Sequence, residues 1–155
     1  MVRSVADALT AGGCSEVVAV GGDTVGLGTL GFDVTPDLHP GEGPLGGVIT
    51  ALASKSGADI VVVVGCDTPF LDGPTVATLV AALRADPSAD VAIGRTDRRQ
   101  PLCAAWRPGS APALVAAFTS GERAVHRAVA SLNCVEVSVP HESVRNVNTP
   151  DDLNG

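Results

Sequence analysis

The hydrophobic pattern of the chain centres on residues 60–64, where five β-branched side chains follow one another without a polar residue. A run of this composition predicts a strand that is buried on both faces, as in the middle of a parallel sheet. Gly65 and Cys66 come next, and Asp67 follows them directly. Pro69 then stops the strand, because proline fixes φ and has no backbone N–H to donate. The pattern therefore places a carboxylate at the carboxyl end of a central strand.

The rest of the pattern alternates between helices and strands. Apolar residues at helical spacing predict helices over residues 2–9, 45–57, 74–83, 111–119 and 122–132, and a further helix that starts at Thr149. Short apolar runs predict strands over residues 16–20, 32–35, 60–64, 90–94, 101–106 and 134–139. Residues 21–31 include five glycines and are predicted to be a connection without regular structure. This order predicts a doubly wound, Rossmann-like α/β sheet that is mostly parallel. One antiparallel pair is expected, between residues 90–94 and 101–106, because only a short turn joins them.

Composition and charge narrow the function classes. A length of 155 residues with 45% hydrophobic residues fits one domain with a proper core. The net charge of −7 disfavours a nucleic-acid groove or an anionic membrane surface as partner, and no apolar run approaches the ~20 residues of a membrane span. The four cysteines are dispersed, which disfavours a zinc site or a disulfide framework. Dispersed thiols, and the lack of a signal-peptide pattern after Met1, lead us to expect a cytoplasmic protein.

Two places on the chain have the composition of a ligand site. Ligands of open α/β sheets bind outside the carboxyl ends of the strands, so Asp67 is a candidate to hold a cation. Capping of the following turn or helix is the alternative for this residue. Asp37 and the glycine-rich residues 41–47 precede a predicted helix, whose free N–H groups and dipole favour an anion. The alternative here is a tight turn between strand and helix.

Two further pairs of residues are candidates for phosphate or ligand contacts. Arg123 and Arg127 stand four residues apart in a predicted helix, where they either reach a phosphate or remain solvated. Asn146 and Asn148 point to the same side of an extended segment, so they either address one ligand together or serve as turn and capping residues. The three histidines have no motif partner, so a nucleophilic triad is not expected.

Six segments, taken in order, resemble the MobA-like nucleotidyltransferases. They are Pro36-Asp37, Gly43-Pro-Leu-Gly-Gly47, Cys66-Asp-Thr-Pro-Phe70, Gln100-Pro-Leu102, Gly121-Glu-Arg-Ala124 and Asn146-Val-Asn-Thr-Pro-Asp-Asp-Leu153. The resemblance covers essentially the whole chain, and the ordered set is more specific than any single motif. It implies a three-layer α/β/α nucleotidyltransferase fold. The Gly-Pro-Leu-Gly run resembles the guanylyl more than the cytidylyl branch, which implies Mg²⁺-dependent transfer of GMP from GTP to molybdenum-bound molybdopterin.

The resemblance also implies roles for individual residues. Asp67 would be the catalytic Mg²⁺ ligand, and Asn146 and Asn148 would belong to the region that faces the pterin phosphate. The residues expected at the nucleotide or substrate are Asp37, Gly43, Pro44, Leu45, Gly46 and Arg123. The implied partners are GTP, the molybdopterin acceptor, and molybdoenzymes or other proteins of cofactor biosynthesis.

One part of the family pattern is missing from these residues. The family's opening strand and its signature loop, of the type Leu-Ala-Gly-Gly-x-Ser-x-Arg-Met-Gly-x-x-Lys, have no counterpart, because neither Arg-Met-Gly nor a lysine follows Ala11-Gly12-Gly13. We therefore expect residues 1–155 to be one N-terminally truncated domain in which strands 16–20 and 60–64 flank an empty strand position. A chain of this kind is expected to be marginally stable, to aggregate or to be completed by a partner, and to be inactive with GTP and Mg²⁺ on its own.

Three other functions stay open at this point. The first is a non-catalytic nucleotide- or partner-binding protein that keeps the same fold. The second is a cytidylyltransferase of the same family. The third is a phospho-acceptor receiver domain with Asp67 as the modified residue, which the sequence disfavours because no acidic cluster follows an earlier strand.

Overall fold

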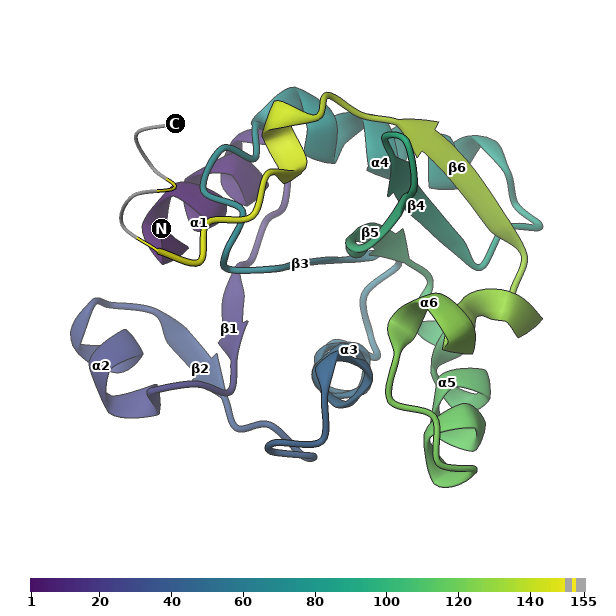
Figure 1. Cartoon of the computed structure of the whole chain (residues 1–155), viewed down its shortest axis with the longest axis horizontal. Coiled ribbons are helices and arrows are strands. Elements are labelled where there is room, and N and C mark those ends of the chain that lie inside the picture. Colours follow the sequence, from purple (N-terminus) through teal and green to yellow (C-terminus); the bar gives the residue numbers. More distant parts are fainter. Residues whose placement is uncertain (150–151, 153–155) are drawn as a thin grey trace.

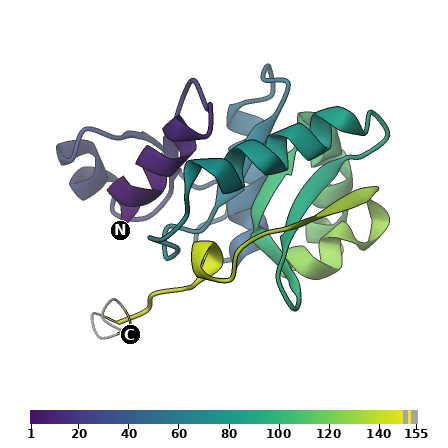
Figure 2. The ribbon, with the colours of Figure 1, turned by 90° about the horizontal axis from the view of Figure 1, so that it is seen from above.

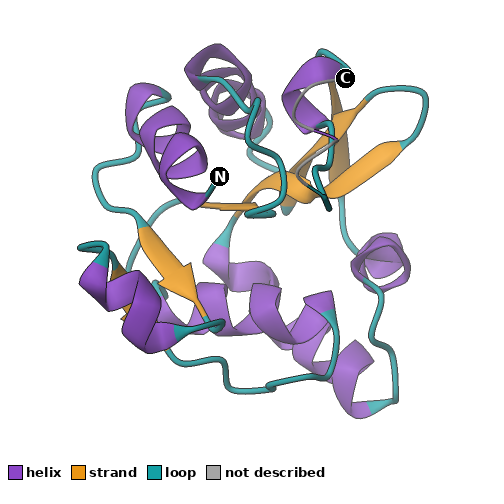
Figure 3. Cartoon of the chain, turned by 60° about the vertical axis from the view of Figure 1, so that its left-hand side comes forward, coloured by secondary structure: helices purple, strands orange, loops and turns teal. Residues whose placement is uncertain are grey.

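The computed structural model describes residues 1–149 and residue 152, and these form three layers (Figure 1). Helices α1 (Val2–Ala11) and α4 (Gly73–Ala85) cover one face of the strands. Helices α3 (Pro44–Ser54), α5 (Ala111–Thr119) and α6 (Val125–Ala128) cover the other face. Figure 3 shows the strands between these two helical layers. No helix in the described part of the chain is both long and apolar enough to cross a membrane.

The strands form two sheets. Strands β1 (Val18–Val20) and β2 (Asp33–Thr35) pair in parallel and form the smaller sheet. The larger sheet has the order β3 (Val61–Val64), β5 (Arg99–Trp106), β4 (Val91–Arg95) and β6 (Cys134–Ser138). Strands β4 and β6 run parallel, whereas β5 runs opposite to both β3 and β4. The predicted class, a mostly parallel Rossmann-like α/β fold with one antiparallel strand, is confirmed.

The prediction for residues 60–64 is correct for the faces of the strand and wrong for its position. Val62 and Val64 pack against the cluster that includes α1 and α4, and Val61 and Val63 pack against the cluster around α3. However, β3 is an edge strand of the larger sheet, and its one ladder among the described residues is the antiparallel one with β5. All four valines are only half-buried for this reason. No ladder joins β1 to β3 among the described residues, in agreement with the expected gap between these strands.

The buried core surrounds the paired strands β4 and β5, which lie between the two helical layers. The first three residues of β4 and the last three of β5 are fully buried, and Trp106 is the largest side chain among them. Val91 and Val61 are both paired with Trp106 across the ladders. Leucines of α3 and α4 close this core from the two sides, namely Leu45, Leu52, Leu79 and Leu83.

Two helix predictions need correction. Residues 21–31 contain a helix, α2 (Thr24–Thr29), because the Asp23 side chain caps it by accepting the N–H of Gly26 at 3.0 Å. The helix predicted over residues 122–132 is shorter: α6 begins at Val125, and a 3₁₀ turn, η2 (Val129–Ser131), follows it. The cause lies at Glu122, whose carboxylate accepts the backbone N–H groups of the next two residues at 2.8 Å and keeps them in a turn.

The chain after β6 runs back across the start of α4 (Figure 2). This stretch contains the 3₁₀ turn η3 (Glu142–Val144), and another, η1 (Pro108–Ser110), precedes α5. The helix predicted to start at Thr149 falls mostly on residues 150–151 and 153–155, which lie outside the described residues. Within the described part, the Asp152 carboxylate accepts the N–H of Thr149 at 2.8 Å. In a capping box, the side chain three positions after the N-cap accepts the N–H of the N-cap in the same way.

Candidate functional site

Asp67 lies in the turn that follows β3, and its side chain is half-buried. The turn itself is held by Thr68, whose hydroxyl donates to the carbonyl of Gly65 at 2.8 Å. Helix α4 is capped by Asp72, whose carboxylate accepts the N–H of Thr75 at 2.7 Å. Thr68 and Asp72 therefore cap the turn and the helix, the role that was the alternative for Asp67. No donor among the described residues binds the Asp67 carboxylate, which leaves it available to a cation.

Gly65 determines where this carboxylate can lie. A Cβ atom at Gly65 would come well within 3.0 Å of Asp67 Oδ1, a distance that real Cβ atoms essentially never show. Only glycine therefore leaves room for the carboxylate to fold back toward the end of β3. The backbone N–H of Gly65 donates to Leu102 of β5 at 3.0 Å, so the position of this glycine is fixed by the sheet.

The structure brings Asn146 and Asn148 next to Asp67. The residue between them, Val147, donates its N–H to the carbonyl of Asp67 at 2.7 Å. Val147 is 2% exposed, whereas both asparagines are exposed, as expected for alternating residues of an extended segment. Neither asparagine amide has a protein partner among the described residues. The backbone of the segment that carries both asparagines therefore lies directly beside the backbone of Asp67.

Asp37 lies at the end of β2 and has a structural role that the sequence did not indicate. Its Oδ1 accepts the N–H of His39 and the hydroxyl of Thr50, both at 2.9 Å. These hydrogen bonds tie the loop before α3 to the middle of that helix. The second oxygen, Oδ2, faces Gly21.

The glycine-rich residues form the N-terminus of α3, as predicted. Gly43 has a φ of 90°, which favours glycine, and Pro44 occupies the first turn without an N–H to offer. The N–H of Leu45 donates to the carbonyl of Arg123 at 3.3 Å, and that of Gly46 donates to the carbonyl of Gly43 at 3.2 Å. The first N–H groups of the helix are therefore bound within the protein, which limits what they can offer an anion.

Arg123 has several protein partners, although its side chain is 41% exposed. Its guanidinium donates to two backbone carbonyls at 2.8 Å, forms an ion pair with Glu42 at 2.8 Å, and stacks 3.9 Å from the centroid of the Phe118 ring. It precedes α6, so Arg127 is not one helical turn further on, contrary to the prediction. Arg127 pairs with Glu122 at 2.7 Å. This hydrogen bond and those from the N–H groups after Glu122 lower the pKa of Glu122 to about 2.

The predicted residues thus form two groups. Asp67, Asn146 and Asn148 form the first, at the end of β3. The second surrounds the N-terminus of α3 and consists of Asp37, Gly43, Pro44, Leu45, Gly46 and Arg123. Among the described residues, no three carboxylate, histidine or cysteine side chains are placed to hold a metal ion together. Asp67 would hold one as a single carboxylate, which suits Mg²⁺ that keeps water and substrate oxygens as its other ligands.

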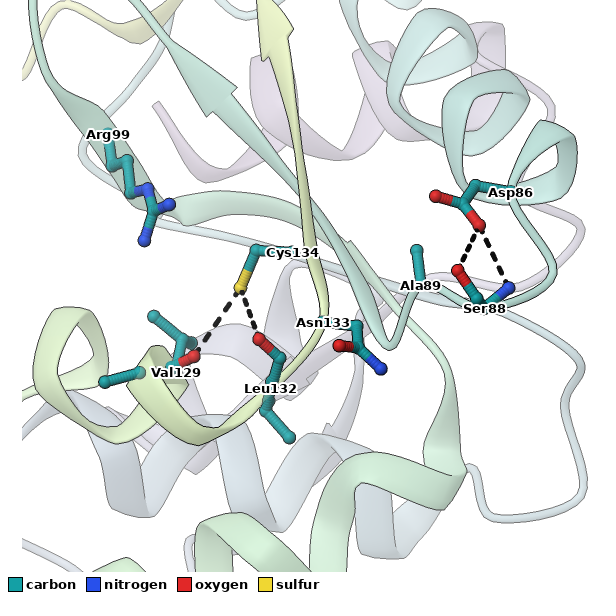
Figure 4. Close-up of a pocket in the computed structure, with 9 residues that line it drawn as sticks. Asp86, Ser88, Ala89, Arg99, Val129, Leu132, Asn133 and Cys134 are labelled. Atoms are coloured by element: carbon teal, nitrogen blue, oxygen red, sulfur yellow. Dashed lines mark hydrogen bonds between the residues drawn. The ribbon is translucent and has the colours of Figure 1, made fainter.

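Two surface pockets are lined by residues outside these two groups. One, of about 430 Å³, is lined by Asp86, Arg99, Asn133 and Cys134 among others (Figure 4). The Cys134 thiol donates to two backbone carbonyls there, and burial raises its pKa, which disfavours the reactive thiolate form. The other, of about 530 Å³, lies between α5 and α6 and includes the Glu122–Arg127 pair.

Comparison with known proteins gives one consistent family. Residues 1–144 match the model of the MobA-like NTP transferase domain. A molybdenum cofactor guanylyltransferase of Cereibacter sphaeroides is 33% identical over 139 residues, which cover 88% of this chain and 70% of the relative. A protein of the same name from Shewanella sp. (strain MR-4) is 36% identical over 130 residues, which cover 79% of this chain and 63% of the relative.

Solved structures agree with this result. The molybdopterin-guanine dinucleotide biosynthesis protein A of Archaeoglobus fulgidus is 28% identical, with a TM-score of 0.72 over 88% of this chain and 74% of that one. The 2-C-methyl-D-erythritol 4-phosphate cytidylyltransferase of Thermus thermophilus also gives a TM-score of 0.72, over 98% of this chain and 84% of that one. At 14% identity, the second protein shares the fold alone.

Proposed function

The chain belongs to the MobA-like NTP transferase family of nucleotidyltransferases, and from this premise we propose that it transfers GMP from GTP to molybdenum-bound molybdopterin. The products are the guanine dinucleotide form of the cofactor and pyrophosphate. Relatives at 33% and 36% identity carry the name molybdenum cofactor guanylyltransferase, which supports GTP as donor and the pterin as acceptor. Both the donor and the acceptor are proposals for this chain.

The observation that carries the proposal is the hydrogen bond from Val147 to Asp67, which places the neighbours of Val147, Asn146 and Asn148, next to Asp67 in the fold. An unpartnered, half-buried carboxylate suits a divalent cation, and two exposed amides beside it suit the oxygens of a phosphate. Mg²⁺ held by Asp67 would neutralise the charge that develops on the transferred phosphoryl group. The residues present fit this ion, because one carboxylate, waters and substrate phosphates are its usual ligands.

The reaction needs positioning more than covalent chemistry from the protein. An oxygen of the acceptor phosphate forms a bond to the α-phosphorus of GTP, and the bond from that phosphorus to the β-phosphate oxygen breaks in line. In our proposal Asp67 helps to position the α-phosphate of GTP, and Asn146 and Asn148 donate hydrogen bonds to the phosphate of the acceptor. No protein group has to change its protonation state, because the attacking oxygen already carries a negative charge at neutral pH.

The alternative is a protein that binds nucleotide without transferring it. The arginines support this second candidate, since Arg123 and Arg127 both pair with carboxylates and are not placed to neutralise the charge that develops on a transferred phosphoryl group. The two candidates differ in one measurable property, the release of pyrophosphate.

The test is an assay of residues 1–155 with GTP, Mg²⁺ and molybdenum-bound molybdopterin, with pyrophosphate and the dinucleotide product measured separately. The proposal expects both products in equal amounts, and their loss in Asp67→Asn. Asp59→Asn is the matched control, because Asp59 is an exposed aspartate in the loop before β3. GTP binding without pyrophosphate would establish the binding protein instead, and activity with CTP but not GTP would establish a cytidylyltransferase.

A further inference from the structure

Two segments that are far apart in the sequence lie antiparallel beside each other next to Asp67. Residues 67–72 join β3 to α4, and residues 143–147 follow β6. Three contacts join the segments in inverted order: Asp67 with Val147, Phe70 with Arg145, and Asp72 with Ser143. The inverted order means that the contacts act along one continuous junction rather than at separate points.

Arg145 is the centre of this junction. The central carbon of its guanidinium lies 4.1 Å from the centroid of the Phe70 ring. Two of its nitrogens donate to Glu142 at 3.0 and 3.1 Å, and the third donates to the carbonyl of Asp152 at 2.6 Å. The side chain is 30% exposed. Three of the five N–H groups of the guanidinium and one of its faces are thus engaged within the protein, which suits a structural role for Arg145.

The stretch that carries Asn148 is tied to the same arginine. The Asp152 carboxylate accepts the N–H groups of Thr149 at 2.8 Å and of Asn148 at 3.0 Å, while its carbonyl accepts from Arg145. The hydrogen bonds from Thr149 and Asn148 hold the pKa of Asp152 below its ordinary value, so this carboxylate is ionised at neutral pH. Arg145 therefore fixes the backbone before Asn146 through Phe70 and the backbone after Asn148 through Asp152.

A second anchor lies further along the junction and does not depend on Arg145. The hydroxyl of Ser143 donates to Asp72 at 2.7 Å and accepts from Thr75 at 3.3 Å. Ser143 is 2% exposed, and Asp72 is the N-cap of α4. Loss of Arg145 therefore leaves the segment attached to the body of the protein and frees only the part that carries the asparagines.

We propose that Arg145 is a positioning residue, which holds Asn146 and Asn148 at a fixed place relative to Asp67 so that acceptor and nucleotide meet in line. This inference deepens the proposed function and rests on it for the identity of the two substrates. The reason is geometric, since misplacing a reacting group by about 1 Å can cost a factor of about 100 in rate. Arg145 touches neither Asp67 nor the asparagine amides and acts through the backbone between them.

The test compares the wild-type chain with Arg145→Met, which keeps the length of the side chain and removes the guanidinium. Arg107→Met is the matched control: Arg107 is also half-buried and donates to the carbonyls of Ala89 and Leu83 at 2.9 and 2.8 Å, but it follows Trp106 at the end of the sheet away from Asp67. Two quantities are measured, the hydrogen exchange of the Val147 amide without substrates, and the KM values for GTP and for molybdenum-bound molybdopterin. Arg145→Lys keeps the charge over Phe70 and is expected to give intermediate values of both.

We expect Arg145→Met to speed exchange at Val147 and to raise the KM of the acceptor, each by about 10-fold, because a cation–π contact and its ion pair are lost together. The KM for GTP should stay within about twofold, and Arg107→Met should change neither quantity. Unchanged exchange at Val147 in Arg145→Met overturns the inference, and so does faster exchange without a change in the ratio of the two KM values. An inactive wild-type chain whose Val147 amide still depends on Arg145 refutes the proposed function and supports the inference.

Discussion

Replacing Gly65 by alanine is expected to separate the activity of the site from the stability of the fold. The added Cβ would lie well within 3.0 Å of Asp67 Oδ1 and has no other close neighbour than this carboxyl group. The φ angle of Gly65 lies outside the left-handed region, so alanine fits its backbone conformation without strain. The substitution therefore acts on Asp67 alone, and the carboxylate has to move.

The size of the effect follows from that displacement. To restore an ordinary contact, the carboxylate oxygen must shift by about 1 Å, a displacement that can cost an active site ~100-fold in rate. A loss of ~100-fold corresponds to about 2.7 kcal/mol of transition-state stabilisation. Folding stability should stay level or rise by about 0.4–1 kcal/mol, because alanine restricts the unfolded chain more than glycine does.

The assay pairs thermal denaturation with Mn²⁺ titration and with pyrophosphate release from GTP. We expect Gly65→Ala to melt no lower than the wild-type protein while it binds Mn²⁺ more weakly and turns over more slowly. Gly57→Ala is the control, because a Cβ at Gly57 meets nothing within 4 Å. Normal Mn²⁺ affinity and normal turnover in Gly65→Ala would refute the assignment of Asp67 as the metal ligand.

Three further predictions use the same site. Asp67→Asn is expected to lose at least ~100-fold in Mg²⁺-dependent turnover without a change in melting temperature, and undiminished activity at saturating Mg²⁺ contradicts the metal assignment. Asn148→Ala is expected to weaken binding of the pterin acceptor more than binding of GTP in titration calorimetry, and equal weakening of both shows the division to be wrong. Ser143→Ala is expected to cost about 1–2 kcal/mol of unfolding free energy at pH 7, because it removes a hydrogen bond to an ionised carboxylate. Burial raises the pKa of Asp72, but the hydrogen bonds from Thr75 and Ser143 outweigh it and keep this pKa below its ordinary value. Their stabilisation is therefore fully present above pH ~4 and is lost as the pH falls through the lowered pKa, so the difference between Ser143→Ala and the wild-type protein should shrink below that pH in urea denaturation.

Local patterns in the sequence were sufficient for much of the fold. Helix α5 has the predicted bounds, and β4 and β5 pair antiparallel as their short connection required. Helix α2 escaped prediction because its glycines, which are poor helix formers, outweighed the capping signal of Asp23. The position of β3 at a sheet edge also escaped, since periodicity reports which faces of a strand are covered but not which neighbours lie beside it.

The site was predictable in part. The place of Asp67 after a buried run and the spacing of Asn146 and Asn148 made each a candidate for either a ligand contact or a cap, and the hydrogen bond from Val147 to Asp67 places the two segments side by side. The partners of the arginines depend on residues far along the chain, so no local pattern could distinguish a guanidinium that awaits a phosphate from one that is already paired. Arg123 is paired in this way, with Glu42.

The inverted junction beside Asp67 also determines when the site can form during folding. Asp72 and Ser143 are 71 residues apart in the sequence, and the contact between them closes a loop that contains α4, β4, β5, α5, α6 and β6. Contacts of such long range form after the local helices and hairpins, because closing a long loop costs conformational entropy before the contact can stabilise the chain. During synthesis, a chain that has emerged only as far as β6 still lacks Ser143, Val147 and both asparagines, so it cannot close this junction.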